Sequence, residues 1–382
     1  MAELEELDYM RYALTLARRA TGRTSPNPLV GAILVKEGRI VGEGCHLCCG
    51  TPHAEVHALN QAGEEARGAT LYVTLEPCSH FGRTGPCADA IIKAGVRKAV
   101  VAMTDPNPKV AGRGIALLRA AGVEVVEGVL AEEAARLNEV FIKWVSCRMP
   151  FGVLKTAMTM DGRIATAAGQ SKWITGAAAR ERVHRLRDTY DTILVGVGTV
   201  LADDPALTTR LPEGGRNPVR IIVDSTARTP LAAKVVCDGQ APTIIAVTPE
   251  APAERIAALQ ARGVEVVAVP RGGTGIDLRA LFRILAERDY TSVFIEGGAA
   301  VNAAALSANV VDKFYAFIAP KIVGGKAAPG PVGGEGVASL ADAVRLEEVA
   351  VDKVGDDLLV TAYVAEREGR DVYRDCGRIR EN

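Results

Sequence analysis

Residues that bind zinc well lie at short spacings in the first quarter of the sequence. His53 is followed two residues later by Glu55, and Cys78 and Cys87 come after them. One imidazole and two thiolates can hold Zn²⁺ tetrahedrally and leave a fourth position for water. Zinc lowers the pKa of such a water towards neutrality, and a nearby carboxylate can then move protons. This set predicts a hydrolytic zinc centre with His53, Cys78 and Cys87 as metal ligands and Glu55 as the catalytic residue.

The elements expected around these residues place all three ligands at junctions between strands and helices. Helices are expected over 54–61 and 88–94, so His53 and Cys87 each stand at the start of a helix. A strand over 70–75 runs directly towards Cys78. The partial positive charge of a helix N-terminus favours the thiolate form of Cys87. Sites in α/β proteins commonly lie at such junctions, which supports the metal interpretation.

Two other interpretations of these residues are weaker. The segment HAEVH over 53–57 suggests a metalloprotease helix, but that motif needs glutamate directly after the first histidine. The cysteines could instead be buried apolar side chains. A His-x-Glu segment followed by Pro-Cys and a second cysteine is more specific, and it is the pattern of zinc deaminases. Three further cysteines, Cys45, Cys48 and Cys49, are interpreted as ordinary thiols, because a second metal site there lacks further partners.

The composition excludes several classes of protein. The 382 residues include 45 Lys and Arg against 46 Asp and Glu, a near-neutral balance that argues against a nucleic-acid partner. Aromatic residues make up 4% of the chain, which leaves few rings to stack on single-stranded bases. There is no long uncharged apolar run and the first residues are acidic, so neither a membrane span nor a signal peptide is expected. Eight cysteines are too few for a disulfide scaffold, and we expect a cytosolic protein.

Short β-branched runs alternate with Ala- and Arg-rich stretches along the whole chain, which predicts an α/β fold. A helix is expected over 132–144, and the segment 145–152 is typical of a domain boundary. We expect one domain over 1–148, a second over 149–366 and a charged tail over 367–382. Further helices are expected over 8–19 and 114–120. The strands expected are 30–35, 70–75, 98–103, 123–128, 152–157, 192–197, 219–224, 243–247, 264–269, 292–295, 313–318 and 357–364.

The second half has no P-loop and no Gly-x-Gly-x-x-Gly motif. Gly196-Val-Gly198 is the nearest candidate, but it lies inside or just after an expected strand. The segment 296–302 (EGGAAVN) follows a strand and opens a helix, so its backbone amides could bind a phosphate. From the residues alone, this segment is equally well explained as a tight turn between strand and helix.

Several motifs resemble known families. The zinc motif resembles that of the cytidine deaminase-like superfamily, in which two residues usually separate the cysteines; here eight do. This longer loop, with the segment 24–31 (TSPNPLVG), resembles the bifunctional riboflavin-biosynthesis deaminase/reductase family. Gly85-Pro86-Cys87 replaces the family's frequent Pro-Pro-Cys but keeps the ligand. In the second half, the segments 154–165, 171–176 and 198–208 resemble the reductase of the same family. The resemblance covers about residues 8–365.

The resemblance implies a cytidine deaminase-like domain followed by a dihydrofolate reductase-like domain that uses NADPH. In the first domain it implies that Asn27 binds the pyrimidine and that His46, His80 and Arg83 meet the substrate phosphate. In the second, it implies two sets of contacts. The NADP contacts are Ala157, Trp173, Thr199, Asp203, Ser225, Gly298, Ala299, Ala300, Val301, Asn302, Ala303 and Ala304. The substrate contacts are Lys155, Ser171, Thr175, Arg187, Leu207, Arg210 and Glu296. Arg187 and Arg210 are expected to bind a ribose 5-phosphate bidentately, and Glu296 to accept hydrogen bonds from sugar hydroxyls.

The function implied is two consecutive steps of riboflavin biosynthesis on a small-molecule substrate. The first is the hydrolytic deamination of a diaminopyrimidinone ribosylamine phosphate. The second is the NADPH-dependent reduction of its ribosyl group to ribityl. One alternative is a zinc deaminase fused to an inactive, structural reductase-like domain. Another is a nucleic-acid-editing deaminase, which the charge and the long cysteine spacing disfavour. A homodimer or homotetramer is expected.

Overall fold

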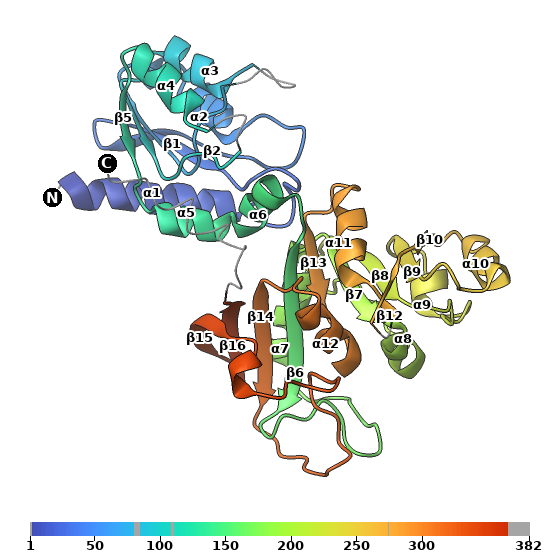
Figure 1. The fold of residues 1–382 in the computed structure, drawn as a ribbon. Helices are drawn as coiled ribbons and strands as arrows, with labels where there is room; N and C mark the ends of the chain where they lie inside the picture. The colour runs from blue at the N-terminus through green and yellow to red at the C-terminus, as the bar shows by residue number, and fades with distance from the viewer. Residues whose placement is uncertain (1, 80–84, 108–110, 274, 366–382) are drawn as a thin grey trace. The chain divides into compact units, whose positions relative to one another are not determined.

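The structure is a computed structural model, and it describes residues 2–79, 85–107, 111–273 and 275–365. The chain divides into two compact units, one that ends at Arg148 and one that begins at Met149 (Figure 1). The expected tail over 367–382 lies outside the described residues.

The first unit is built on a five-stranded sheet with the order β2-β1-β3-β4-β5. β1 is antiparallel to both of its neighbours, whereas β3, β4 and β5 are parallel to one another. The strands are β1 (Gly31–Lys36), β2 (Arg39–Cys45), β3 (Thr70–Val73), β4 (Lys98–Val101) and β5 (Glu124–Glu127). β3 and β4 carry the buried apolar runs expected of strands that are covered on both faces, whereas the edge strand β5 is only half-buried.

Helices of the first unit pack closely on this sheet. They are α1 (Ala2–Arg18), α2 (Ala54–Ala62), η1 (Gly63–Ala66), α3 (Cys87–Ala94), α4 (Arg113–Ala120), α5 (Ala131–Leu137) and α6 (Glu139–Cys147). α2 lies directly against β2, where a Cβ added to Gly44 would be 2.4 Å from the backbone oxygen of Ala54. Only glycine at this position lets α2 approach so closely. β2 therefore sets how near to the sheet the helix that follows His53 can pack.

Two features of the first unit differ from the sequence-based expectation. β2 was not expected, because Gly42, Glu43 and Gly44 interrupt its apolar pattern. The single helix expected over 132–144 is wrong, since α5 and α6 are separated at Asn138. The buried Asn138 side chain accepts a hydrogen bond from the backbone N–H of Leu29 at 2.8 Å and donates to its carbonyl at 3.0 Å. The helix break therefore fixes the loop that contains Asn27.

The second unit is built on a nine-stranded sheet with the order β10-β9-β8-β7-β13-β6-β14-β16-β15. The strands from β10 to β14 are parallel, and β16 and β15 extend the sheet in antiparallel fashion. The strands are β6 (Phe151–Thr159), β7 (Thr192–Gly196), β8 (Val219–Val223), β9 (Thr243–Val247), β10 (Glu265–Ala268), β13 (Ser292–Ile295), β14 (Lys313–Ala319), β15 (Leu346–Val354) and β16 (Asp357–Val364). A separate two-stranded ribbon joins β11 (Arg271–Gly272) to β12 (Gly275–Ile276).

Helices connect most of the parallel strands (Figure 1). They are α7 (Ala177–Thr189), α8 (Val197–Asp203), α9 (Lys234–Cys237), α10 (Ala253–Gln260), α11 (Leu278–Ala286), α12 (Ala299–Ser307) and the short η2 (Leu340–Asp342). β15 was not expected, because this edge strand is exposed along almost its whole length and lacks an apolar run. In the described part of the chain, no helix is both long and apolar enough to span a membrane.

Candidate active sites

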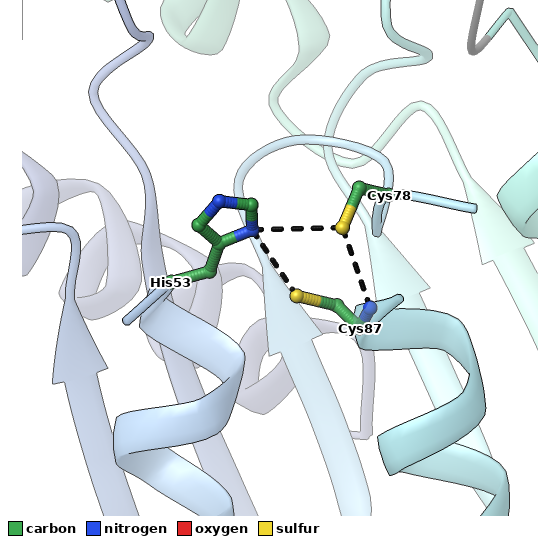
Figure 2. Close-up of side chains that lie close together, drawn as sticks. All are labelled: His53, Cys78 and Cys87. Atoms are coloured by element: carbon green, nitrogen blue, oxygen red, sulfur yellow. Dashed lines mark hydrogen bonds between the residues drawn. The ribbon is translucent and has the colours of Figure 1, made fainter. Parts of the chain in front are cut away.

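The three expected zinc ligands meet at one point of the first unit (Figure 2). His53 caps the start of α2, Cys87 is the first residue of α3, and Cys78 lies in the loop after β3. The Nδ1 atom of His53 is 3.2 Å from Cys87 Sγ and 3.5 Å from Cys78 Sγ. A tetrahedral zinc ion with bonds of about 2.0–2.3 Å spaces its ligand atoms about 3.5 Å apart. The side chains thus fit zinc in both chemistry and spacing, with Nδ1 as the histidine ligand atom.

The electrostatics of this cluster favour a thiolate and a proton-carrying carboxyl group. Hydrogen bonds from the Cys87 thiol, from His53 and from the Cys87 backbone N–H, 3.3 Å away, lower the pKa of Cys78 to about 4. Glu55 is 3% exposed, and burial raises its pKa to about 7. A carboxyl group with such a pKa can both take up and release a proton near neutral pH.

A buried carboxylate fixes the loop that carries Cys78. Glu76 is 3% exposed and accepts four backbone N–H groups from a segment about 30–40 residues further along the chain. The donors are Asp105 at 3.1 Å, Gly112 at 2.9 Å, Gly114 at 2.8 Å and Ile115 at 3.3 Å. Because the last two lie in the first turn of α4, the helix N-terminus adds a favourable charge to the carboxylate.

The structure also brings Asn27 and His46 to the metal ligands. The Nδ2 atom of Asn27 is 3.1 Å from His46 Nε2, and the His46 ring lies edge-on to His53 with 5.5 Å between ring centroids. His46 Nδ1 is 3.3 Å from the carbonyl oxygen of Pro52, to which it can only donate. Nε2 therefore accepts from Asn27, so His46 is neutral, and burial lowers its pKa. His80 and Arg83 lie outside the described residues.

The remaining cysteines of this region form no second cluster. Cys45 is half-buried, and burial raises the pKa of its thiol, whereas Cys48 and Cys49 are exposed. Among the described residues, the group of His53, Cys78 and Cys87 is the only one with metal-ligand spacing.

In the second unit, a charged cluster lies where β13 ends. The carboxylate of Glu296, directly after β13, accepts from Arg187 on α7, with Nε–Oε1 at 2.6 Å and Nη2–Oε2 at 3.1 Å. Lys155 on β6 approaches the same carboxylate with Nζ–Oε2 at 3.3 Å. Burial opposes ionisation of Glu296, but the two cations outweigh it and lower its pKa to about 2. Glu296 is therefore an ionised acceptor held in a fixed position.

The two expected phosphate-binding arginines have different surroundings. Arg187 uses Nε and Nη2 for Glu296 and Nη1 for the carbonyl oxygen of Thr208 at 3.1 Å. Its bidentate face is thus engaged by a carboxylate of the protein itself. Arg210 instead contacts the ring of His184, and Leu207 nearby is buried with a positive φ of 54°.

Two glycines with open space around them lie at the starts of helices, Gly198 in the first turn of α8 and Gly298 before α12. Gly298 caps α12, and a Cβ added there would meet only Thr199 Oγ1, at 3.8 Å; at Gly198 it would meet nothing within 4 Å. In contrast, a Cβ at Gly297 would be 2.7 Å from the Val301 side chain, so this position must be glycine. Backbone N–H groups that no side chain covers at a helix N-terminus can bind a phosphate group. This agrees with the dinucleotide expected at this site.

The other residues expected to contact NADPH or the reductase substrate lie on β6, α8 and α12 or in the adjoining loops. Trp173 is 65% exposed, and the guanidinium of Arg180 lies 4.8 Å from its ring centroid. Asp203, the last residue of α8, pairs with Lys172 at 3.3 Å. Asn302 is buried in α12 and donates to the carbonyl oxygen of Pro331 at 2.7 Å. Ala157 lies on β6, Ser171 and Thr175 in the following loop, Ser225 just after β8, and Ala299, Ala300, Val301, Ala303 and Ala304 on α12.

Comparison with known proteins finds the same two parts. The family model for the cytidine and deoxycytidylate deaminase zinc-binding region matches residues 4–103. The model for the RibD C-terminal domain matches residues 150–360. The riboflavin biosynthesis protein RibD of Actinobacillus pleuropneumoniae is 45% identical over 361 residues, which cover 94% of this chain and 96% of that protein. The chain belongs to the RibD family.

Solved RibD structures share the fold. RibD of Acinetobacter baumannii has a TM-score of 0.85 at 38% identity, covering 95% of this chain and 99% of that chain. A deaminase/reductase structure from Thermotoga maritima has a TM-score of 0.84 at 38% identity, covering 96% and 100%. Membership of the RibD family confirms the expected α/β fold class, with a cytidine deaminase-like domain and a dihydrofolate reductase-like domain. It also confirms the expectation of a bifunctional enzyme of riboflavin biosynthesis that uses zinc and NADPH.

Two residues of this RibD chain were not found from its sequence. The position of Glu76 directly before Pro77-Cys78 was the only sequence feature that pointed to it. Its role could not be predicted because the backbone N–H groups that it accepts, such as those of Asp105 and Gly114, lie far along the chain. His184 stands three residues before Arg187 on a charged helix, where a solvated side chain is the ordinary expectation.

Proposed function

We propose that this chain acts on 2,5-diamino-6-(5-phosphoribosylamino)pyrimidin-4(3H)-one in two consecutive steps. The first unit would remove an amino group as ammonia. The second would reduce the ribosyl group with NADPH and give 5-amino-6-(5-phosphoribitylamino)uracil. One observation carries this proposal: both sites are present in one chain. The first is the His53–Cys78–Cys87 cluster beside the buried Glu55, and the second is the ionised Glu296 near the open helix starts at Gly198 and Gly298.

In the deaminase, His53, Cys78 and Cys87 would hold the zinc ion, which when bound supplies an acidified water. Glu55 would take the proton of the attacking water and deliver protons to the ring nitrogen and the leaving amine. Its buried position and a pKa of about 7 suit both directions of transfer. Asn27 would hydrogen-bond the pyrimidine, oriented by the neutral ring of His46. His80 and Arg83 would meet the phosphate; His46, also expected to do so, has both ring nitrogens engaged by Asn27 and Pro52.

In the reductase, NADPH would supply the hydride when it is bound. The backbone N–H groups at the open helix starts of Gly198 and Gly298 would bind its phosphates. Trp173, Asp203 and Ser225 would be among the further contacts. Glu296 would accept hydrogen bonds from the sugar hydroxyls and hold C1′ in place, because Arg187 and Lys155 keep its carboxylate ionised and fixed. Arg210 would provide the charge for the 5-phosphate.

Counting both products tests the proposal directly. Zinc-loaded protein is given the diaminopyrimidinone substrate and NADPH, and ammonia release and NADPH oxidation are followed together. A ratio near one, with both signals dependent on the substrate, supports two consecutive activities. Ammonia without NADPH oxidation would instead favour the alternative of a deaminase with a structural reductase-like domain.

We further propose a cytosolic homodimer or homotetramer. No disulfide joins any of the seven cysteines within the described residues, as is usual in a reducing compartment. β15 leaves one sheet edge exposed with Val349 and Val351 on it, and exposed edge strands commonly pair with another chain. Light scattering of the purified protein at several concentrations measures the assembly; a monomer throughout would contradict the proposal.

A further inference from the structure

His184 lies inside the reductase site without an assigned role. It stands on α7 three residues before Arg187, so the two side chains share one face of the helix. It is half-buried, and both of its ring nitrogens lie close to Arg210, which is 26 residues away in the sequence. The side chain therefore joins α7 to the loop that follows Leu207.

The contacts of this ring require it to be neutral. Nδ1 accepts the backbone N–H of Arg210 at 3.3 Å, and Nε2 is 3.5 Å from Arg210 Nη2. An imidazole nitrogen can accept only when it carries no proton, so Nδ1 is unprotonated and the single proton of the neutral ring lies on Nε2, which does not accept from Arg210. A protonated ring would lose the backbone contact and place a third positive charge beside Arg187 and Arg210.

The surrounding charges keep the ring in that state. Burial, followed by the positive charges of Arg187 and Arg210, lowers the pKa of His184 to about 4. The carboxylate of Glu296 and the carbonyl oxygen of Thr208 oppose this shift without reversing it. His184 thus remains a hydrogen-bond acceptor at neutral pH.

Arg210 has no directly paired carboxylate among the described residues, although the charge of Glu296 acts on it from a distance. Within the described residues it forms no ion pair, whereas Arg187 is paired with Glu296. Burial and the nearby Arg187 both lower the pKa of Arg210, and the carboxylate of Glu296 opposes this shift without reversing it. A bound anion would supply the missing partner, and phosphate oxygens suit a guanidinium.

We propose that His184 is a positioning residue for the reductase substrate, whose Nδ1 atom anchors the backbone of Arg210 and so places the guanidinium where it meets the substrate's phosphate. The proposal rests on the function proposed above for the second unit. It assigns no proton transfer to His184, which acts through Arg210 alone.

Three substitutions separate this role from a general structural one. His184→Ala removes both ring nitrogens and should raise the reductase KM for the deaminated substrate about tenfold, the effect of one lost hydrogen bond to a binding loop. Its kcat, its KM for NADPH and ammonia release by the first unit should stay within about twofold. His184→Asn keeps an acceptor at the Nδ1 position and should restore most of the affinity, whereas His184→Gln, with its acceptor at the Nε2 position, should not.

A double-mutant cycle tests the route through Arg210. If His184 acts only through that residue, His184→Ala should add nothing to the KM of Arg210→Ala. An unchanged KM in His184→Ala, an additive effect in the cycle, or rescue by Gln but not Asn would each overturn the proposal. So would a loss of kcat and NADPH affinity together, which would indicate a folding defect of the unit. The wild-type protein is assayed first: no NADPH oxidation there would refute the proposed reductase function itself, a result distinct from any change among the variants.

Discussion

The guanidinium of Arg187 binds the carboxylate of Glu296 with two hydrogen bonds, although the two residues are 109 positions apart in the sequence. Paired charges of this kind are costly to separate, because the partner that remains is buried and unpaired. The pair therefore sets both the orientation and the charge of the acceptor in the reductase site.

Arg187→Ala should weaken reductase activity and change its pH profile. Arg187 and Lys155 together lower the pKa of Glu296 to about 2, so removal of Arg187 raises that pKa. Activity that needs the ionised carboxylate is then lost at a higher pH as the solution is made acidic. We expect kcat/KM to fall about 10–100-fold at neutral pH. Arg185→Ala on the same helix, which removes an exposed arginine paired with Glu181 and Glu213, is the matched control. A profile identical to wild type would contradict the assignment.

Glu55→Ala should abolish ammonia release while zinc stays bound, because Glu55 is placed as a proton carrier and not as a ligand. Loss of a positioned general acid–base group typically costs about 10²–10⁴-fold in rate. Ammonia release is measured together with zinc content by atomic absorption. Glu64→Ala, at an exposed carboxylate of η1, should behave as wild type. Loss of zinc along with activity would show that the role assignment is wrong.

Removal of zinc should separate the two activities. A chelator that strips the metal from His53, Cys78 and Cys87 should stop ammonia release, whereas NADPH oxidation with the deaminated intermediate should continue. The reason is that the reductase cluster around Glu296 contains none of these ligands. Readdition of one zinc ion per chain should restore ammonia release. Equal loss of both activities on chelation would argue against independent sites.

Glu76→Gln should lower zinc affinity without removing a ligand. The carboxylate accepts four backbone N–H groups, and an amide would turn an N–H donor towards some of them. The loop of Cys78 would then be held less firmly, and loss of such outer contacts typically weakens metal binding about 10–100-fold. Competition with a zinc chelator measures the affinity. An unchanged dissociation constant would mean that the loop is positioned by other contacts.

NADPH should quench the fluorescence of Trp173. The chain has two tryptophans, of which Trp173 is 65% exposed and Trp144 is buried in α6. Trp144→Phe should keep the NADPH-dependent quenching, whereas Trp173→Phe should remove it and weaken NADPH binding. Titration of each variant with NADPH checks this. Quenching that persists in Trp173→Phe would place the nicotinamide or its phosphates elsewhere.

Local patterns in the sequence predicted most of the elements and pointed to His53, Cys78 and Cys87 as candidate zinc ligands. His53, Cys78 and Cys87 each stand next to a strand or helix whose apolar pattern is continuous, so their junctions could be predicted from neighbouring residues alone. The same patterns predicted most strands of both sheets. They did not show β15, whose exposed position requires no apolar run, or the break at Asn138, which depends on a partner at Leu29.

Only the tertiary structure decided which polar groups meet. The N–H groups around Glu76, the pairing of Arg187 with Glu296 and the contact of His184 with Arg210 all join segments that are distant in sequence. Such contacts form because the carboxyl ends of parallel strands and the adjoining loops gather at one edge of a sheet. A carboxylate or an imidazole looks the same in the sequence whether it faces solvent or a buried partner. Burial and the neighbouring charges decide its protonation state, and both exist only once the chain has folded.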